Sequence, residues 1–137
     1  MSLRVFLDTN IILDLLGKRD EFYEPIAKLA TLAEKKTITF FASPISFATV
    51  HYFLSKYENQ KTATEKLRKF KIICTVAHTD EPAVEKALNS DFNDFEDALQ
   101  YFSALNSECN IILTRDPKGF KRSELPAMSA EEFLSGF

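Results

Sequence analysis

The sequence has little of several features that mark large classes of protein. Its 137 residues include only three glycines, two cysteines and no tryptophan. It also contains no run of about 18 consecutive apolar residues, which argues against a membrane-spanning helix. The apolar stretch Val5–Leu7 is too short for the core of a signal peptide and runs straight into Asp8. We therefore expect a cytoplasmic protein.

The two cysteines and the modest basic content also limit which classes of protein the chain can belong to. Cys74 and Cys109 are far apart, form no C-x-x-C motif and sit among apolar neighbours, so we expect buried, reduced thiols. The net charge is −3, which argues against a protein that holds nucleic acid through a general positive field. A nuclease is still possible, because bound metal ions invert the local charge of a carboxylate cluster.

Short apolar runs alternate with amphipathic stretches along the whole chain. Apolar residues make up 45% of the sequence, and no linker, repeat or low-complexity run divides it, so we expect a single domain over residues 1–137. Strands are predicted at 4–7, 37–42, 71–77 and 110–114, with a short extended piece at 127–128, and helices at 10–16, 21–35, 44–56, 60–70, 79–88, 93–106 and after Ser129. Continuously apolar strands separated by helices indicate an α/β fold, a three-layer α/β/α sandwich with a central parallel sheet.

Several of the predicted helices begin with a recognisable capping residue. Ser43 precedes Pro44, Thr79 precedes an acidic first turn, and Ser129 with Glu132 forms a capping box.

Acidic and hydroxyl side chains stand where the predicted strands end. The first strand ends at Asp8, the second at Ser43, and the fourth is followed closely by Asp116. Asp94 and Asp97 lie three residues apart in the first turns of a predicted helix and so share one face. Because ligands bind at the carboxyl ends of parallel strands, we expect these four carboxylates to meet in one cleft.

A group of carboxylates is costly unless a cation lies among them. All-oxygen sites of this kind suit Mg²⁺ or Mn²⁺, which can activate water for attack on a phosphodiester. Each acid also has an ordinary structural explanation. Asp8 could cap a helix, Asp94 and Asp97 could interact with a helix dipole, and Asp116 could open a turn before Pro117. The metal-site hypothesis depends on all four lying at one edge of the sheet.

Other candidate groups carry weaker signals. His51 and His78 are not at metal-ligand spacing, and no P-loop, G-x-S-x-G or Gly-rich fingerprint is present. A basic stretch is typical of a solvated helix face, although contact with RNA phosphates is an alternative; it comprises Lys61, Lys66, Arg68, Lys69 and Lys71.

Three segments together resemble the PIN domain family. The opening Val5–Asp14 is similar to the start of such domains, Asp94–Ala104 is similar to their acidic helix, and Ile111–Asp116, followed by Phe120, resembles their closing motif. The three occur in order across essentially the whole chain.

The resemblance implies a ribonuclease that depends on Mg²⁺ or Mn²⁺ and leaves 5′-phosphate and 3′-hydroxyl products. The family includes the toxin halves of bacterial VapBC-type toxin–antitoxin pairs, so an antitoxin partner and a homodimer formed through apolar helix faces are expected. By the same resemblance, the metal ligands are Asp8, Asp97 and Asp116. Asn10 and Thr114 would support that site, and Ser43 would line its rim.

One position departs from the family pattern. Thr49 stands where a glutamate is expected in the helix after the second strand, and a hydroxyl cannot supply its charge. Asp94 is the candidate for a compensating fourth carboxylate. A PIN-like binding module without catalysis is the main alternative. A dehalogenase-like phosphotransfer enzyme would need a second aspartate at Asn10, and a receiver domain would need one at the end of the third strand, where the chain has Thr75.

Overall fold

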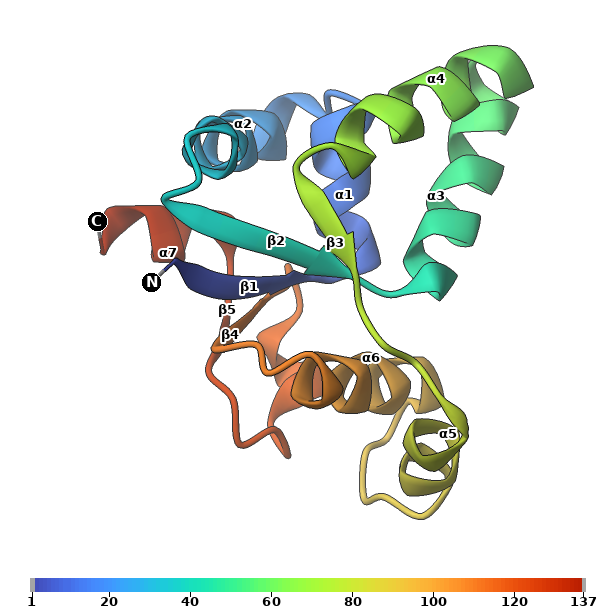
Figure 1. The fold of residues 1–137 in the computed structure, drawn as a ribbon, viewed down its shortest axis with the longest axis vertical. Coiled ribbons are helices and arrows are strands. Elements are labelled where there is room, and N and C mark those ends of the chain that lie inside the picture. The colour runs from blue at the N-terminus through green and yellow to red at the C-terminus, as the bar shows by residue number, and fades with distance from the viewer. Residues whose placement is uncertain (1, 137) are drawn as a thin grey trace.

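A five-stranded, fully parallel sheet forms the centre of the molecule, for which a computed structural model describes residues 2–136 (Figure 1). Its strand order is β3-β2-β1-β4-β5. Val5 in the central strand lies opposite Phe40 on one side and Ile111 on the other. The strands are β1 (Leu3–Leu7), β2 (Ile38–Ala42), β3 (Cys74–Val76), β4 (Ile111–Leu113) and β5 (Ala127–Met128). The parallel sheet expected from the sequence is confirmed.

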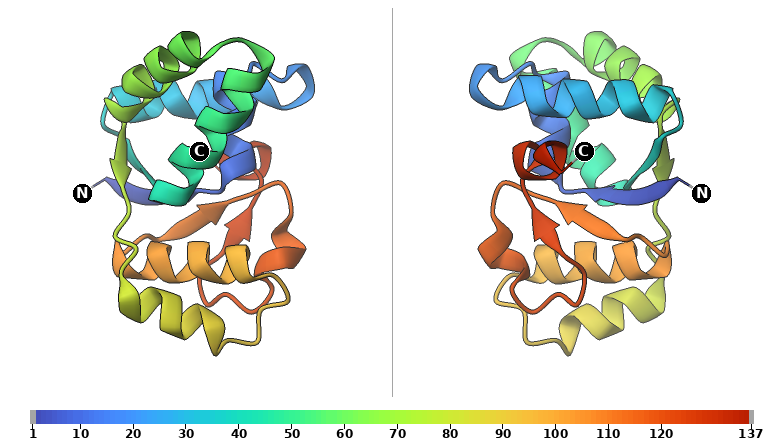
Figure 2. Two further views of the ribbon diagram at one scale, coloured as in Figure 1. Left: turned by 90° about the vertical axis from the view of Figure 1, so that its right-hand side faces the viewer. Right: turned by 90° about the vertical axis from the view of Figure 1, so that its left-hand side faces the viewer.

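Helices cover both faces of this sheet, as the views in Figures 1 and 2 show. One layer contains α1 (Thr9–Leu16), α2 (Asp20–Glu34), α3 (Pro44–Tyr57) and α4 (Gln60–Lys71), and α7 (Ala130–Ser135) packs against α2. The other layer contains α5 (Glu81–Leu88) and α6 (Phe95–Asn106), and a 3₁₀ helix, η1 (Pro117–Phe120), contacts α6. The expected α/β/α sandwich is therefore confirmed.

The alternation of side chains along β1 divides the core between the two layers. Val5 and Leu7 are fully buried in the cluster beneath α1 and α2, while Phe6 is fully buried in the cluster on the α6 side. Burying each such side chain contributes about 1.5–3 kcal/mol to stability. The next residue, Asp8, leaves the sheet at its carboxyl edge, between the two helix layers.

Capping residues fix where the helices begin. Ser43 caps α3, Asp94 caps α6 and Ser129 caps α7, each accepting a backbone N–H through its side chain. The expectation that Thr79 caps α5 is wrong. Asp80 Oδ1 accepts the Ala83 N–H at 3.0 Å, while the Thr79 hydroxyl bonds to that of Ser103.

The remaining sequence expectations concern cysteines, histidines and the basic helix. Cys74 and Cys109 are buried free thiols, and burial raises the pKa of each to about 12. His51 shares a hydrogen bond with a threonine of α4, and His78 is exposed. Lys66 of α4 bonds to Glu58 and to a backbone carbonyl, whereas Arg68 is exposed. None of the helices in residues 2–136 is long and apolar enough to cross a bilayer.

Candidate active site

Asp8 joins the ends of β1 and β4. Its backbone N–H donates to the Leu113 carbonyl at 2.9 Å. Its Oδ1 accepts the Thr9 N–H, and its Oδ2 accepts the Thr114 hydroxyl, both at 2.8 Å. The side chain is therefore held by both strand ends. Burial raises the pKa of Asp8, while the hydrogen bonds from Thr114 and Thr9 partly oppose that rise.

Asp97 brings a second carboxylate to this edge from the start of α6. It is the third residue of α6, and Asp94 Oδ1 caps the helix by accepting the Asp97 N–H at 3.0 Å. Burial, and after it the neighbouring carboxylates of Asp8, Asp94, Asp116 and Glu96, together raise the pKa of Asp97 to about 7. Burial is the largest cause, and the four carboxylates add to it because they disfavour a further negative charge.

Asp116 completes the arrangement from the loop after β4. Its N–H donates to the Thr114 hydroxyl oxygen at 3.1 Å, so one threonine orders both Asp8 and Asp116. Gly119 of η1 lies against two of these acids, Asp97 of α6 and Asp116 of the loop. A Cβ at Gly119 would collide with Asp97 Oδ2 and lie 3.6 Å from Asp116 Oδ2. The missing side chain is what allows η1 to approach the carboxylates.

Glu96 is an acidic residue that sequence reasoning missed. Burial raises its pKa, and the Asp8 and Asp94 carboxylates raise it further, so its side chain shares the field of this group. The signal was present, because three acids fall within the four residues 94–97. Only the pair spaced three apart was considered.

A buried polar network supports the site from below. Thr9 of α1 and Ser46 of α3 share a hydrogen bond at 2.7 Å between their hydroxyls. Gln100 of α6 donates to Ser46 at 2.8 Å and to Thr9 at 3.3 Å. All three side chains are buried, and a hydrogen bond from Gln100 also lowers the pKa of Asp8. The network links the three helices that surround Asp8.

Three other predicted residues take different positions. Ser43 is wholly buried, and its hydroxyl accepts the Ser46 N–H at 3.3 Å. The expectation that it lines an exposed rim is therefore wrong. Asn10 is exposed on α1, two residues beyond Asp8, and its side chain makes no hydrogen bond within residues 2–136. Thr49 is half-buried on α3 and leaves that helix without an acid there.

The donor set suits a hard divalent cation. The acids Asp8, Asp97, Asp116 and Glu96 offer only oxygen, the ligand atom that Mg²⁺ and Mn²⁺ prefer. No ion pair in the described part of the chain neutralises any of them. As these side chains stand, no group of three acids, histidines or cysteines within residues 2–136 is arranged to hold one ion.

The sequence of this chain is similar to those of known proteins. Residues 4–118 match the family described as the PIN domain. The chain is 28% identical over 137 residues to Ribonuclease VapC1 of Aquifex aeolicus, covering 96% of this chain and 94% of that protein.

Solved structures share the fold. VapBC2 of Rickettsia felis, crystallised with a DNA fragment of its promoter, contains a chain that superposes with a TM-score of 0.67 at 20% identity, covering 93% of this chain and 98% of that one. VapC20 of Mycobacterium tuberculosis, a sarcin–ricin loop cleaving toxin, gives a TM-score of 0.66 at 16% identity, covering 84% and 92%. At these identities the similarity shows the fold alone.

Proposed function

The chain belongs to the PIN domain family, and from this premise we propose that it is an endoribonuclease that depends on Mg²⁺ or Mn²⁺. The observation that carries the proposal is the gathering of Asp8, Asp97, Asp116 and Glu96 at the carboxyl edge of the sheet, where no ion pair among the described residues neutralises them. Burial and the surrounding carboxylates raise the pKa of Asp97 to about 7, in keeping with this crowding. A cation is the natural counter-charge.

Each residue of the site has a distinct role in this proposal. Asp8, Asp97 and Asp116 would hold the metal, and Glu96 would add negative charge beside Asp8. A bound divalent ion lowers the pKa of water and stabilises charge on phosphate oxygens. Thr114 orients Asp8 and the Asp116 backbone through its hydroxyl. The loss of that hydroxyl would remove one hydrogen bond from the Asp8 carboxylate and one from the Asp116 N–H.

The decisive experiment is RNA cleavage with Mn²⁺ by the wild type and by Asp8→Asn. The asparagine keeps an oxygen that can accept the Thr9 N–H but removes the charge. We expect cleavage to fall about 100-fold or more, the scale seen when a group that stabilises transition-state charge is lost. Glu34→Gln, an exposed change at the end of α2, is the matched control and should cleave like the wild type. Equal cleavage by Asp8→Asn would refute the proposed site.

A binding module that has lost catalysis is the second candidate, and Thr49 is the observation that favours it. Without the glutamate expected there, the site has one carboxylate fewer on α3. Such a module would bind RNA in the presence of Mn²⁺ but leave it intact, and Asp8→Asn would not weaken that binding.

We also infer a role as the toxin of a toxin–antitoxin pair in the cytoplasm. An acidic site with no ion pair from the described residues suits the inserted arginine of a small partner protein, because a guanidinium bonds two carboxylate oxygens at once. A structural relative from Klebsiella pneumoniae is a toxin–antitoxin complex by name. The partner of this chain would neutralise the nuclease by occupying the same carboxylates.

A homodimer formed through α3 and α5 completes the proposal. Both helices face the viewer in the left panel of Figure 2, and both carry exposed apolar side chains: Tyr52 and Tyr57 on α3, Val84 and Leu88 on α5. Exposed apolar groups of this kind mark association surfaces. Sedimentation should show a dimer that Leu88→Asp converts to a monomer. Ile72→Asp, at an exposed apolar residue just after α4, should leave the dimer intact, and a monomeric wild type would contradict the inference.

A further inference from the structure

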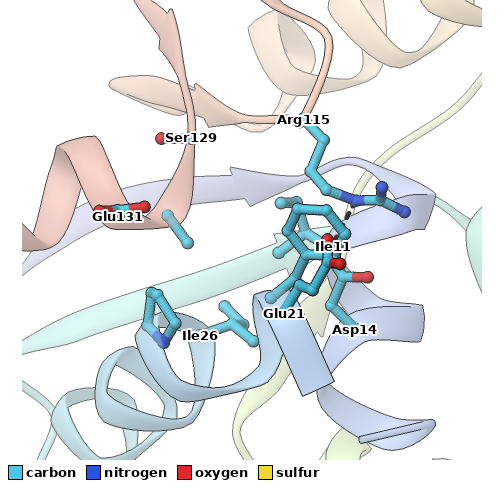
Figure 3. A pocket seen from close by; sticks show the side chains of 10 residues that line it. Ile11, Asp14, Glu21, Ile26, Arg115, Ser129 and Glu131 are labelled. Atoms are coloured by element: carbon cyan, nitrogen blue, oxygen red, sulfur yellow. Dashed lines mark ion pairs between the residues drawn. The ribbon is translucent and has the colours of Figure 1, made fainter. Parts of the chain in front are cut away.

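Arg115 lies between Thr114 and Asp116, but its side chain turns away from the carboxylates toward α1 and α2. Its Nε lies 2.9 Å from Asp14 Oδ2, and its Cζ lies 4.2 Å from the centre of the Phe22 ring. Figure 3 shows this ion pair at one end of a pocket of about 230 Å³, with Ser129 and Glu131 at the other end. The guanidinium is thus held at one edge and across one face.

The outer part of the same guanidinium has no partner. Within residues 2–136, its two terminal nitrogens make no hydrogen bond, and the side chain is 28% exposed. Asp14, in contrast, is 2% exposed through its side chain and is approached by Arg19 as well, at 3.8 Å. Arginine presents its terminal nitrogens as a planar fork that matches the oxygens of a phosphate. Nε lies within ion-pair distance of Asp14 without making a hydrogen bond, so charge attraction and the stack on the Phe22 ring together hold the guanidinium and leave this fork open to a ligand.

The ion pair is not explained by stability alone. Burial raises the pKa of Asp14 even though Arg115 and Arg19 both lower it, so the carboxylate loses more by desolvation than these arginines return. Buried pairs of this kind can often be replaced by apolar residues without loss of stability. A positioning role for Asp14 accounts for its presence.

The location of Arg115 indicates what it would bind. Asp14 lies six residues after Asp8, the N-cap of α1, which corresponds to about 9 Å along the helix axis. The Arg115 side chain therefore reaches from beside Asp116 to a point about two turns along α1, next to the candidate metal site. RNA entering this site must be held against clustered negative charge on a chain of net charge −3. The pocket beside Arg115 also contains Glu21 and Glu131, which repel an anion from its interior. An anion would therefore meet Arg115 at the exposed terminal nitrogens.

We propose that Arg115 binds a backbone phosphate of the RNA strand next to the cleaved bond, with Asp14 and Phe22 as its positioning residues. This inference rests on the proposed ribonuclease function, for which it supplies a substrate-binding residue. It assigns one phosphate contact and no base contact, so the contribution to affinity should be the same for every RNA sequence.

The test measures the binding of a fluorescently labelled 12-nucleotide single-stranded RNA by fluorescence anisotropy at several salt concentrations. Ca²⁺ takes the place of Mn²⁺ in these measurements. Arg115→Gln should weaken binding about 3- to 10-fold and reduce the slope of log affinity against log salt by about 0.7, the loss of one phosphate contact on a single strand. Lys35→Gln removes the same charge from an exposed position just after α2, outside the basic stretch of α4, and should change neither quantity measurably. Thermal melting of each variant shows that it is folded.

Asp14→Leu, which removes the carboxylate and leaves no oxygen to face Nε, separates positioning from simple charge. Removing a negative charge near a polyanion should tighten binding if only the overall field matters, whereas loss of the ion pair at Nε should weaken it. We expect weakening of about 3-fold in a folded variant, and tighter binding would overturn the positioning role. Phe22→Leu, which removes the stacking surface alone, should weaken binding in the same direction.

The outcomes also separate this inference from the proposed function. If the wild type cleaves RNA while Arg115→Gln binds it like Lys35→Gln, the proposed nuclease function stands and the phosphate contact is wrong. If Arg115→Gln instead loses only binding to a partner protein, Arg115 belongs to a protein interface and the inference fails. If the wild type neither binds nor cleaves RNA, the ribonuclease function and the phosphate contact are both wrong.

Discussion

At the scale of single residues, the acids at the start of α6 have different tasks. Asp94 uses Oδ1 to cap the helix at the Asp97 N–H, so part of its hydrogen-bonding capacity is already committed. Glu96 makes no such bond, and the pKa of its carboxyl group is raised by burial and by Asp8. The sequence suggested Asp94 as the substitute for the glutamate missing at Thr49. We propose Glu96, whose carboxylate is not committed to a cap, as a second candidate for this role.

Substitutions on α6 distinguish these two acids. Glu96→Gln should weaken Mn²⁺ binding about tenfold, which is the effect of a lost charged group beside a metal. Asp94→Asn should weaken it less, because Asp94 Oδ1 already accepts the Asp97 N–H and the asparagine oxygen can keep that bond. Isothermal titration with Mn²⁺ measures both.

Thr49→Glu provides the complementary test. In the Glu96→Gln background it should restore part of the lost Mn²⁺ affinity, because it returns a carboxylate to the position that the family usually uses. If Asp94→Asn instead proves the more damaging change and Thr49→Glu rescues that variant, the original assignment to Asp94 is the correct one.

At the scale of elements, the sequence was most informative where local signals decide the structure. Ser43 before Pro44 and Ser129 before Glu132 each cap the predicted helix. The third strand was less well predicted. Residues 71–77 looked uniformly extended, but α4 continues through Lys71 and the strand contains only Cys74–Val76. Ile72 is 83% exposed, so its apolar character misled the assignment.

Contacts between elements explain what could not be predicted. The hydrogen bonds among Thr9, Ser46 and Gln100 join three helices that are distant in sequence, and no local pattern specifies them. The approach of Gly119 to Asp97 likewise depends on how η1 packs on α6. Sequence reasoning located the acids through strand ends and helix starts, which are local features. It could not supply the neighbours that orient them.

At the scale of the whole molecule, the negative charge gathered in the site lowers the free energy of unfolding. The pKa of Asp97 is about 7 in the folded protein and 3.8 as its ordinary value. As the pH rises, the unfolded chain therefore releases this proton at a lower pH than the native state does. Between these values the native state binds more protons, and the free energy of unfolding falls as the pH rises. Above about pH 7 the carboxylate is charged in both states and the full penalty remains. Function and stability thus oppose each other at this residue.

Asp97→Asn should therefore stabilise the protein at pH 8 and change it little at pH 4. The asparagine resembles the protonated side chain, so it removes a penalty of about 1–2 kcal/mol at pH 8, after allowance for solvent screening of a half-buried group. For a domain of this size that corresponds to a rise in Tm of several degrees. Mn²⁺ should raise the Tm of the wild type at pH 8 and have much less effect on Asp97→Asn, because the cation replaces the proton among the carboxylates. Calorimetry at both pH values, with Glu34→Gln as the control, measures each shift. A variant that is less stable than the wild type at both pH values would show that Asp97 contributes to the fold through its hydrogen bonds and packing instead.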